Sequence, residues 1–168
     1  MKKDIILVLG PICSGKTTYC QSFCYAAPDT KYIKVSDIVR QLSKKAVRSE
    51  MQQTSHLDAE ISAALIHAID DALSSELYNS IIIDGIRQLS IVRMLIAYFG
   101  MERITMHWLE VPYDIRKARY NSLSRQRDDL SFEEATDRDS KLGLEELENV
   151  LSTLFHIIKL DNHNDNSN

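Results

Sequence analysis

The chain has 168 residues, of which 44% are hydrophobic, and this fits one domain with one buried core. The formal net charge of −4 gives no overall attraction to nucleic acid, and the odd number of three cysteines does not indicate a disulfide framework. Because no apolar run approaches the roughly 20 residues that span a membrane, and no signal-peptide pattern is present, we expect a cytoplasmic protein with no membrane partner.

The first predicted strand, Ile5 to Leu9, leads directly into Gly-Pro-Ile-Cys-Ser-Gly-Lys-Thr at residues 10–17, a complete GxxxxGK[ST] phosphate loop. Glycines allow the backbone to turn its N–H groups toward an anion, and the helix that follows points its positive end at the same place. Lys16 can reach the β- and γ-phosphates, and the Thr17 hydroxyl can bind Mg²⁺. We therefore predict binding of Mg-ATP by Gly10, Cys13, Ser14, Gly15, Lys16, Thr17 and Thr18.

The second predicted strand, Tyr32 to Val35, ends in Ser36 and Asp37, with Arg40 three residues further on. One interpretation is a helix capped by Ser36 with a surface pair of Asp37 and Arg40. The other is an acceptor site, because a guanidinium binds phosphate through two parallel hydrogen bonds. Asp37 would then orient Arg40, or accept a proton from a hydroxyl acceptor.

A long amphipathic helix is predicted next, because apolar residues recur every four positions. These residues are Leu57, Ile61, Leu65, Ile69, Leu73 and Leu77. The third predicted strand, Ser80 to Asp84, continues into Gly85-Ile86-Arg87. An acidic residue at the tip of a buried strand suits Mg²⁺, and Gly85 lets a substrate approach the backbone while Arg87 offers a second phosphate contact. The alternative is a turn held by an ion pair between Asp84 and Arg87.

The fourth predicted strand, Ile104 to Val111, precedes an arginine-rich stretch that contains Arg116, Arg119, Arg125, Arg127 and Arg138. Arginines beside a phosphate site indicate a lid that neutralises charge in the transition state and excludes water. The alternative is a solvated charged helix, which the nearby acidic residues also fit. A fifth strand is predicted from Phe155 to Leu160, followed by a disordered tail at 162–168.

Short apolar runs that alternate with helical patterns are typical of a parallel sheet built from crossover units. We therefore predict an α/β fold with three layers and five parallel strands, forming a single domain over residues 1–161. Ligands of such sheets bind outside the carboxyl ends of the strands. The polar segments after the first, second, third and fourth strands all fall at those ends.

Taken together, these segments resemble the nucleoside monophosphate kinases, a group of P-loop kinases. Val-Ser-Asp-Ile-Val-Arg at 35–40 is similar to the acceptor-phosphate segment of adenylate kinases, and Asp-Gly-Ile-Arg at 84–87 is similar to their Asp-Gly-x-x-Arg segment, one residue shorter. The segments at 82–87, 125–129 and 138–139 also resemble archaeal kinases related to dephospho-coenzyme A kinase. The resemblance implies an acceptor-binding helical region at 36–78 and a short lid at about 120–138. It also implies that Arg116 lies beside the donor adenine and that Arg119, Arg125, Arg127 or Arg138 contacts phosphates.

The leading hypothesis is transfer of the ATP γ-phosphoryl group to a small-molecule nucleotide, a nucleoside or deoxynucleoside monophosphate. Lys16, Asp84 and the lid arginines would stabilise the transfer. A second hypothesis is a hydroxyl acceptor, on a molecule such as dephospho-coenzyme A or a modified base in DNA, with Asp37 as general base and Lys44, Lys45 and Arg48 as a local basic groove. A third is a regulatory ATPase or switch without an acceptor.

Overall fold

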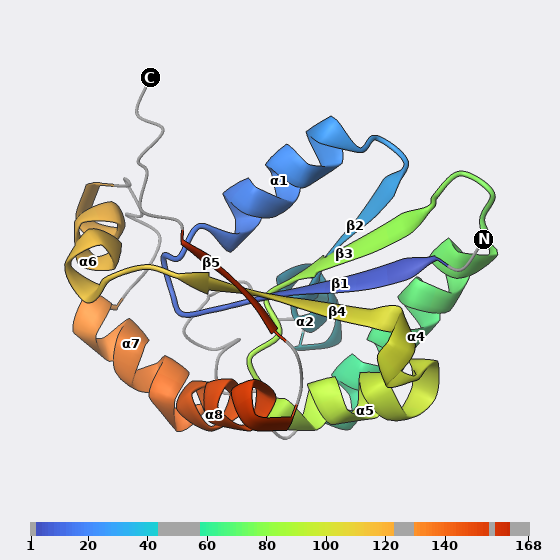
Figure 1. Cartoon of the computed structure of the whole chain (residues 1–168). Coiled ribbons are helices and arrows are strands. Elements are labelled where there is room, and N and C mark those ends of the chain that lie inside the picture. The colour runs from blue at the N-terminus through green and yellow to red at the C-terminus, as the bar shows by residue number, and fades with distance from the viewer. Residues whose placement is uncertain (1–2, 44–57, 123–129, 155–156, 162–168) are drawn as a thin grey trace.

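Five strands form one parallel sheet in the computed structural model, which describes residues 3–43, 58–122, 130–154 and 157–161. The strand order is β2-β3-β1-β4-β5, so the strand that leads into the phosphate loop lies at the centre (Figure 1). The strands are β1 (Asp4–Leu9), β2 (Thr30–Lys34), β3 (Ser80–Asp84), β4 (Ile104–Glu110) and β5 (Ile157–Asp161). The predicted five-stranded parallel sheet is confirmed.

Helices cover both faces of the sheet, as the predicted three-layer arrangement requires (Figure 1). Helix α1 lies on one face, and α4, α5 and α8 lie on the other. The helices are α1 (Lys16–Ala26), α2 (Val35–Ser43), α4 (Asp58–Ser74), α5 (Leu89–Phe99), α6 (Tyr113–Ser122), α7 (Phe132–Lys141) and α8 (Leu144–Leu154), with a short 3₁₀ helix, η2 (Met101–Arg103), before β4. Among the described residues, no helix combines the length and apolarity needed to cross a membrane.

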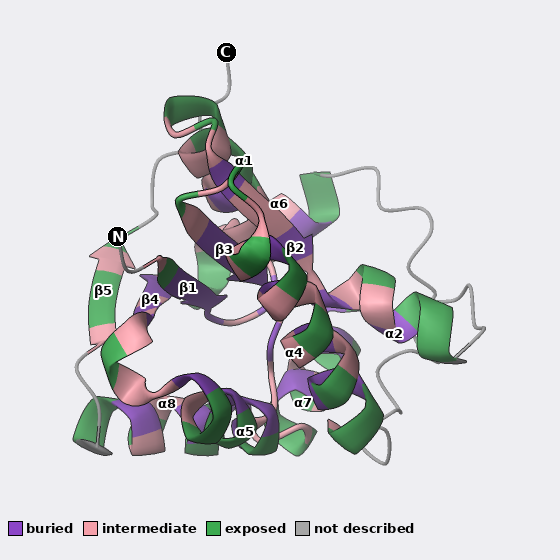
Figure 2. Cartoon of the chain, turned by 90° about the vertical axis from the view of Figure 1, so that its right-hand side faces the viewer, coloured by how far each residue is buried: buried purple, intermediate pink, exposed green. Residues whose placement is uncertain are grey.

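Two hydrophobic layers hold the helices to the sheet. Side chains alternate between faces along a strand, so Ile5 and Leu7 of β1 join the layer under α4, α5 and α8, whereas Ile6 and Val8 pack with Cys20 of α1. Strand β1 is buried along almost its whole length, whereas α5 and α8 carry buried residues beside exposed ones (Figure 2). The sheet therefore forms a rigid support whose carboxyl edge carries the loops.

Several predicted boundaries are wrong. Leu77 was expected on the long helix, but α4 ends at Ser74 and Leu77 is 75% exposed. The Lys3 ammonium accounts for this end, because it donates to the carbonyl oxygen of Leu73 at 2.8 Å and to that of Ser75, and a cation stabilises a helix C-terminus.

The second and fifth strands also differ in extent from their predictions. Strand β2 begins two residues earlier than predicted, at Thr30, and Val35 already belongs to α2. Strand β5 runs from Ile157 to Asp161, where it pairs with β4, whereas Phe155 lies outside the described residues. Leu57 and the predicted tail at 162–168 also lie outside them.

Truncating the buried stripe of α4 should destabilise the protein. Leu65 is fully buried between α4 and the sheet, so we expect Leu65→Ala to lower the free energy of unfolding by about 2–5 kcal/mol, because it removes apolar contacts and leaves a cavity. Leu77→Ala, on the exposed residue beyond the helix, is the matched control and should change it by less than about 0.5 kcal/mol. Urea denaturation followed by circular dichroism measures both, and equal effects would contradict this account of the core.

Candidate active site

The phosphate loop has the left-handed backbone that its sequence requires. Gly10 and Gly15 have φ angles of 135° and 86°, and Cys13 has a φ of 59° although it is not glycine. A Cβ atom on Gly10 would lie 2.8 Å from the carbonyl oxygen of Leu109 in β4, so a larger residue does not fit there. Gly15 is the residue that precedes α1, which places the loop at the positive end of that helix.

Lys16, the first residue of α1, folds back over the loop. Its ammonium donates to the carbonyl oxygens of Gly10 at 2.8 Å and Pro11 at 2.7 Å, and to the buried Ser14 hydroxyl at 3.3 Å. Burial, followed by the positive charge of Arg87, lowers the pKa of Lys16 to about 8, and the carboxylates of Asp139 and Asp84 oppose this shift. Positive charges are thus gathered at this loop, which suits an anionic ligand.

Three side chains from three elements meet at the carboxyl end of β3. The Thr17 hydroxyl of α1 donates to Asp84 Oδ2 at 2.7 Å, and the Tyr32 hydroxyl of β2 donates to the same oxygen at 3.0 Å. Asp84 is only 4% exposed. These are oxygen donors, which Mg²⁺ prefers, so Thr17 and Asp84 fit the predicted metal. Tyr32 was not predicted, although its position two residues before the end of β2 places it beside this site.

Asp139 is the second residue that sequence reasoning missed. It is 3% exposed, and its carboxylate accepts hydrogen bonds from the Arg87 guanidinium at 2.7 Å and from the Ile12 backbone N–H at 2.8 Å. A signal was present in the sequence, since Asp139 continues the apolar spacing of Phe132 and Ala135 along α7 and is the acidic member of that buried stripe. Arg87 was expected to contact an acceptor phosphate or, in the alternative interpretation, to form an ion pair with Asp84. In the structure it forms its ion pair with Asp139.

The segment predicted to bind the acceptor lies on α2, which follows β2 without an intervening loop. Asp37 and Arg40 form an ion pair at 2.8 Å, with side chains that are 57% and 54% exposed. The prediction that Ser36 caps this helix is wrong, because α2 begins at Val35 and Ser36 lies in its first turn. Within the part of the chain that the structure describes, the buried Ser36 hydroxyl has no hydrogen-bond partner. Gly85, with a φ of 100°, faces the start of the same helix at Val35.

The predicted lid arginines are divided between two helices and the segment that joins them. Arg116 and Arg119 of α6 donate to the carbonyl oxygens of Ile12 at 3.4 Å and Cys13 at 3.5 Å, so both reach the phosphate loop. Arg138 lies on α7 and is half-buried. Arg125 and Arg127 lie outside the described residues. Thr18, expected to contact the triphosphate, is exposed on the first turn of α1.

Helices α6 and α7 pack against each other and against the phosphate loop. The Tyr120 hydroxyl of α6 donates to the Leu130 carbonyl oxygen at 2.6 Å, and the rings of Tyr120 and Phe132 lie 5.5 Å apart. Ile12 of the loop is buried in a cluster with Tyr120, Phe132 and Ala135. The described part of the predicted lid is therefore joined to the loop by apolar contacts.

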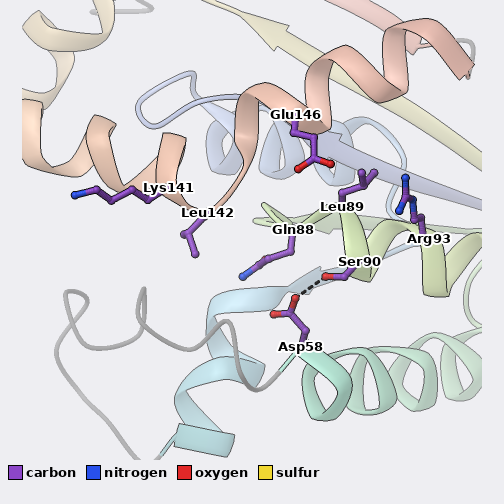
Figure 3. Close-up of a pocket in the computed structure, with 8 residues that line it drawn as sticks. All are labelled: Asp58, Gln88, Leu89, Ser90, Arg93, Lys141, Leu142 and Glu146. Atoms are coloured by element: carbon purple, nitrogen blue, oxygen red, sulfur yellow. Dashed lines mark hydrogen bonds between the residues drawn. The ribbon is translucent and has the colours of Figure 1, made fainter.

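A cleft of about 330 Å³ opens beside Arg87, where the ends of α4, α5, α7 and α8 converge (Figure 3). Gln88, the residue after Arg87, extends into it, and the Ser90 hydroxyl donates to Asp58 Oδ2. The other carboxylate oxygen of Asp58 is buried and has no hydrogen-bond partner among the described residues. The cleft is lined by Asp58, Gln88, Leu89, Ser90, Arg93, Lys141, Leu142 and Glu146.

Comparison with known proteins identifies the fold. No family model and no curated protein matches the chain. It is similar in structure to a chain of the Pnkp1/Rnl/Hen1 RNA repair complex, with a TM-score of 0.61 and 15% identity over 98% of this chain and 50% of that one. It is also similar to a gluconokinase from Sinorhizobium meliloti 1021, with a TM-score of 0.54 and 14% identity over 98% of this chain and 85% of that one.

The chain thus spans half the length of the first of these two proteins. The parallel sheet, its flanking helices and the phosphate loop after β1 define the fold class as that of the P-loop kinases.

Enlarging Gly10 should disable the phosphate loop with little effect on the rest of the fold. In Gly10→Ala the new methyl group would meet the Leu109 carbonyl oxygen at 2.8 Å, so β4 and the loop must separate and the loop N–H groups lose their common direction. We expect Mg-ADP affinity, measured by isothermal titration calorimetry, to fall by at least about tenfold. Gly143→Ala is the control, because Gly143 also has a positive φ, of 87°, so that alanine is strained there too, but the nearest atom would lie at 3.8 Å and no clash results. Wild-type affinity in Gly10→Ala would contradict the role assigned to the loop.

Proposed function

We propose that this protein is an ATP-dependent phosphotransferase that moves the γ-phosphoryl group to a nucleotide acceptor, a nucleoside or deoxynucleoside monophosphate. The observation that carries the proposal is the meeting of Lys16, the Thr17–Asp84 pair and the Arg87–Asp139 pair around one phosphate loop. Phosphoryl transfer asks mainly for positioning and charge stabilisation. These residues supply both without a nucleophile of the protein's own.

The donor half of the site follows from the loop and its neighbours. Lys16 would leave the carbonyl oxygens of Gly10 and Pro11 and bind the β- and γ-phosphates. Thr17 and Asp84 would hold Mg²⁺, which when bound neutralises phosphate charge. Arg116 and Arg119 reach the loop from α6, and they would contact the nucleotide from there. Arg125, Arg127 and Arg138 would make further contacts to the phosphates.

The acceptor half would lie between α2 and the segment after β3. Arg40 offers an exposed guanidinium, and Asp37 orients it. The buried Ser36 hydroxyl, which has no hydrogen-bond partner among the described residues, would gain one if it bonded a bound acceptor. An unpaired buried hydroxyl is costly, so a ligand contact there would be favourable. Gly85 lies against Val35 at the start of α2, and Gln88 extends into the neighbouring cleft (Figure 3).

A hydroxyl acceptor is the second candidate, and one observation favours it. Arg87 is already held by Asp139, which leaves Arg40 as the exposed member of the two predicted acceptor arginines. Asp37 then presents a carboxylate that is 57% exposed and oriented by Arg40, an arrangement suited to accepting a proton from a hydroxyl group. Such a hydroxyl could belong to a small molecule or to a nucleic acid.

Screening acceptors tests the proposal directly. Purified protein with Mg-ATP is incubated with each nucleoside monophosphate, with dephospho-coenzyme A and with hydroxymethylated DNA, and ADP release is measured. We expect one or more nucleoside monophosphates to stimulate release. Stimulation by dephospho-coenzyme A or DNA alone would replace the proposal by the hydroxyl-acceptor candidate. Hydrolysis of ATP that no acceptor stimulates would indicate a regulatory ATPase.

Removing the Arg40 guanidinium separates the two halves of the site. In Arg40→Ala we expect the KM for the nucleotide acceptor to rise by about 10- to 100-fold, the equivalent of a lost charge-assisted hydrogen bond of about 1.5–3 kcal/mol. The KM for ATP should change by less than about threefold. Gln41→Ala, on the next and equally exposed residue of α2, is the control. Equal effects on acceptor and ATP would remove Arg40 from the acceptor site.

A further inference from the structure

We propose that Asp139 is a positioning residue. Its carboxylate holds the Arg87 guanidinium and the backbone of the phosphate loop in the positions needed for phosphate binding, and α7 thereby becomes part of the phosphate site. The inference rests on the proposed function, since it assigns a role within that site. Its basis is geometric. One buried carboxylate joins three segments that are far apart in the sequence, through bonds of 2.7 Å to Arg87 and 2.8 Å to Ile12.

The packing of α7 alone does not require a carboxylate at position 139. Phe132 and Ala135 share the buried stripe of α7 with Asp139, and an apolar residue would continue that stripe. A buried charge is unfavourable unless it is paired and fully hydrogen-bonded. Both oxygens of Asp139 have a partner, and both partners belong to the phosphate site and not to α7. The residue type is therefore explained by what Asp139 does for that site.

For Arg87, the bond to Asp139 fixes the direction of the guanidinium. The Arg87 side chain is largely buried, and its charge is the second largest cause of the lowered pKa of Lys16, so the two cations lie near each other. Two neighbouring cations repel unless an anion lies between or beside them. Asp139 supplies that anion before a triphosphate binds. Among the described residues Arg87 contacts Asp139 through Nη1 alone, which leaves other N–H donors of the guanidinium for phosphate.

For the phosphate loop, Asp139 fixes the backbone from the outside. The Ile12 N–H bonds to Asp139, while the Ile12 side chain packs with Tyr120, Phe132 and Ala135. Lys16 and Arg116 already bind carbonyl oxygens in the first half of the loop. The bond to Asp139 adds a contact to an N–H group, and the Ile12 side chain adds apolar contacts to α6 and α7. Because the loop is already ordered, its remaining N–H groups can bind the phosphates without a further loss of conformational entropy when the nucleotide binds.

The experiment compares Asp139→Asn with Arg87→Gln, with the double variant and with Asp137→Asn as control. Asp137 lies on the same helix, is exposed, and pairs only with the exposed Lys141 among the described residues. Mg-ADP binding is measured by calorimetry and the turnover of Mg-ATP by ADP release. Asparagine keeps an oxygen for one partner but loses the charge and one acceptor position, so Arg87 is no longer held as before.

We expect Asp139→Asn to lower kcat by about 10- to 100-fold, the usual effect of a misplaced group near the reacting atoms. The KM for ATP should change by less than about threefold, and Asp137→Asn should match wild type. Because Asp139 acts in part through Arg87, the loss in the double variant should be smaller than the product of the two single losses. A residue that only supports the fold would lower the melting temperature and leave kcat of the folded protein unchanged.

Wild-type kcat in Asp139→Asn, or losses in the two single variants that multiply in the double variant, would overturn the inference. If Asp139→Asn does not fold, Asp139→Glu keeps the charge and displaces Arg87 by one methylene group; it should fold and be slower, and wild-type turnover there would also overturn the inference. Failure of the wild-type protein to bind Mg-ADP is a distinct result, which would overturn the proposed function and the inference with it.

Discussion

Two buried carboxylates, Asp84 and Asp139, are the constraint on which the arrangement at the sheet edge depends. Each accepts two hydrogen bonds, and together they join β2, β3, α1, α7 and the phosphate loop. Burial of a carboxylate is favourable only while its partners remain in place. The positions of Thr17, Tyr32, Arg87 and Ile12 are therefore linked to one another through these two residues, although they come from distant parts of the chain.

The division of labour between the carboxylates follows from their surroundings. Asp84 is surrounded by hydroxyl groups from Thr17 and Tyr32, and burial together with the Asp84 carboxylate raises the pKa of Tyr32, which keeps that hydroxyl a donor. Asp139 is surrounded by a guanidinium and a backbone N–H. A set of exchangeable hydroxyl contacts can open to a metal ion, whereas a guanidinium pair with a fixed backbone contact suits a permanent support.

The sequence predicts the fold more completely than the site, and the reason is physical. Strand alternation, helical spacing and the phosphate loop are local patterns, so the five parallel strands could be predicted. Thr17 and Asp84 follow the neighbouring parallel strands β1 and β3, so it could also be predicted that they lie at the same edge of the sheet. The pair of Arg87 and Asp139 spans 52 residues, and its two partners come together only through packing of α7 on the loop. The misplaced end at Leu77 has the same origin, because Lys3 closes α4 from 70 residues away.

The central place of β1 has a consequence for how the protein is made. Strand β1 pairs with β3 and β4. Both pairings can form only after β4, which ends at Glu110, has left the ribosome. Pairings over such separations form slowly, and the unpaired strand is exposed meanwhile. The contact between Ile12 and Asp139 comes later still. Competence to bind a nucleotide should therefore be acquired only after α7 has been translated, long after the phosphate loop itself.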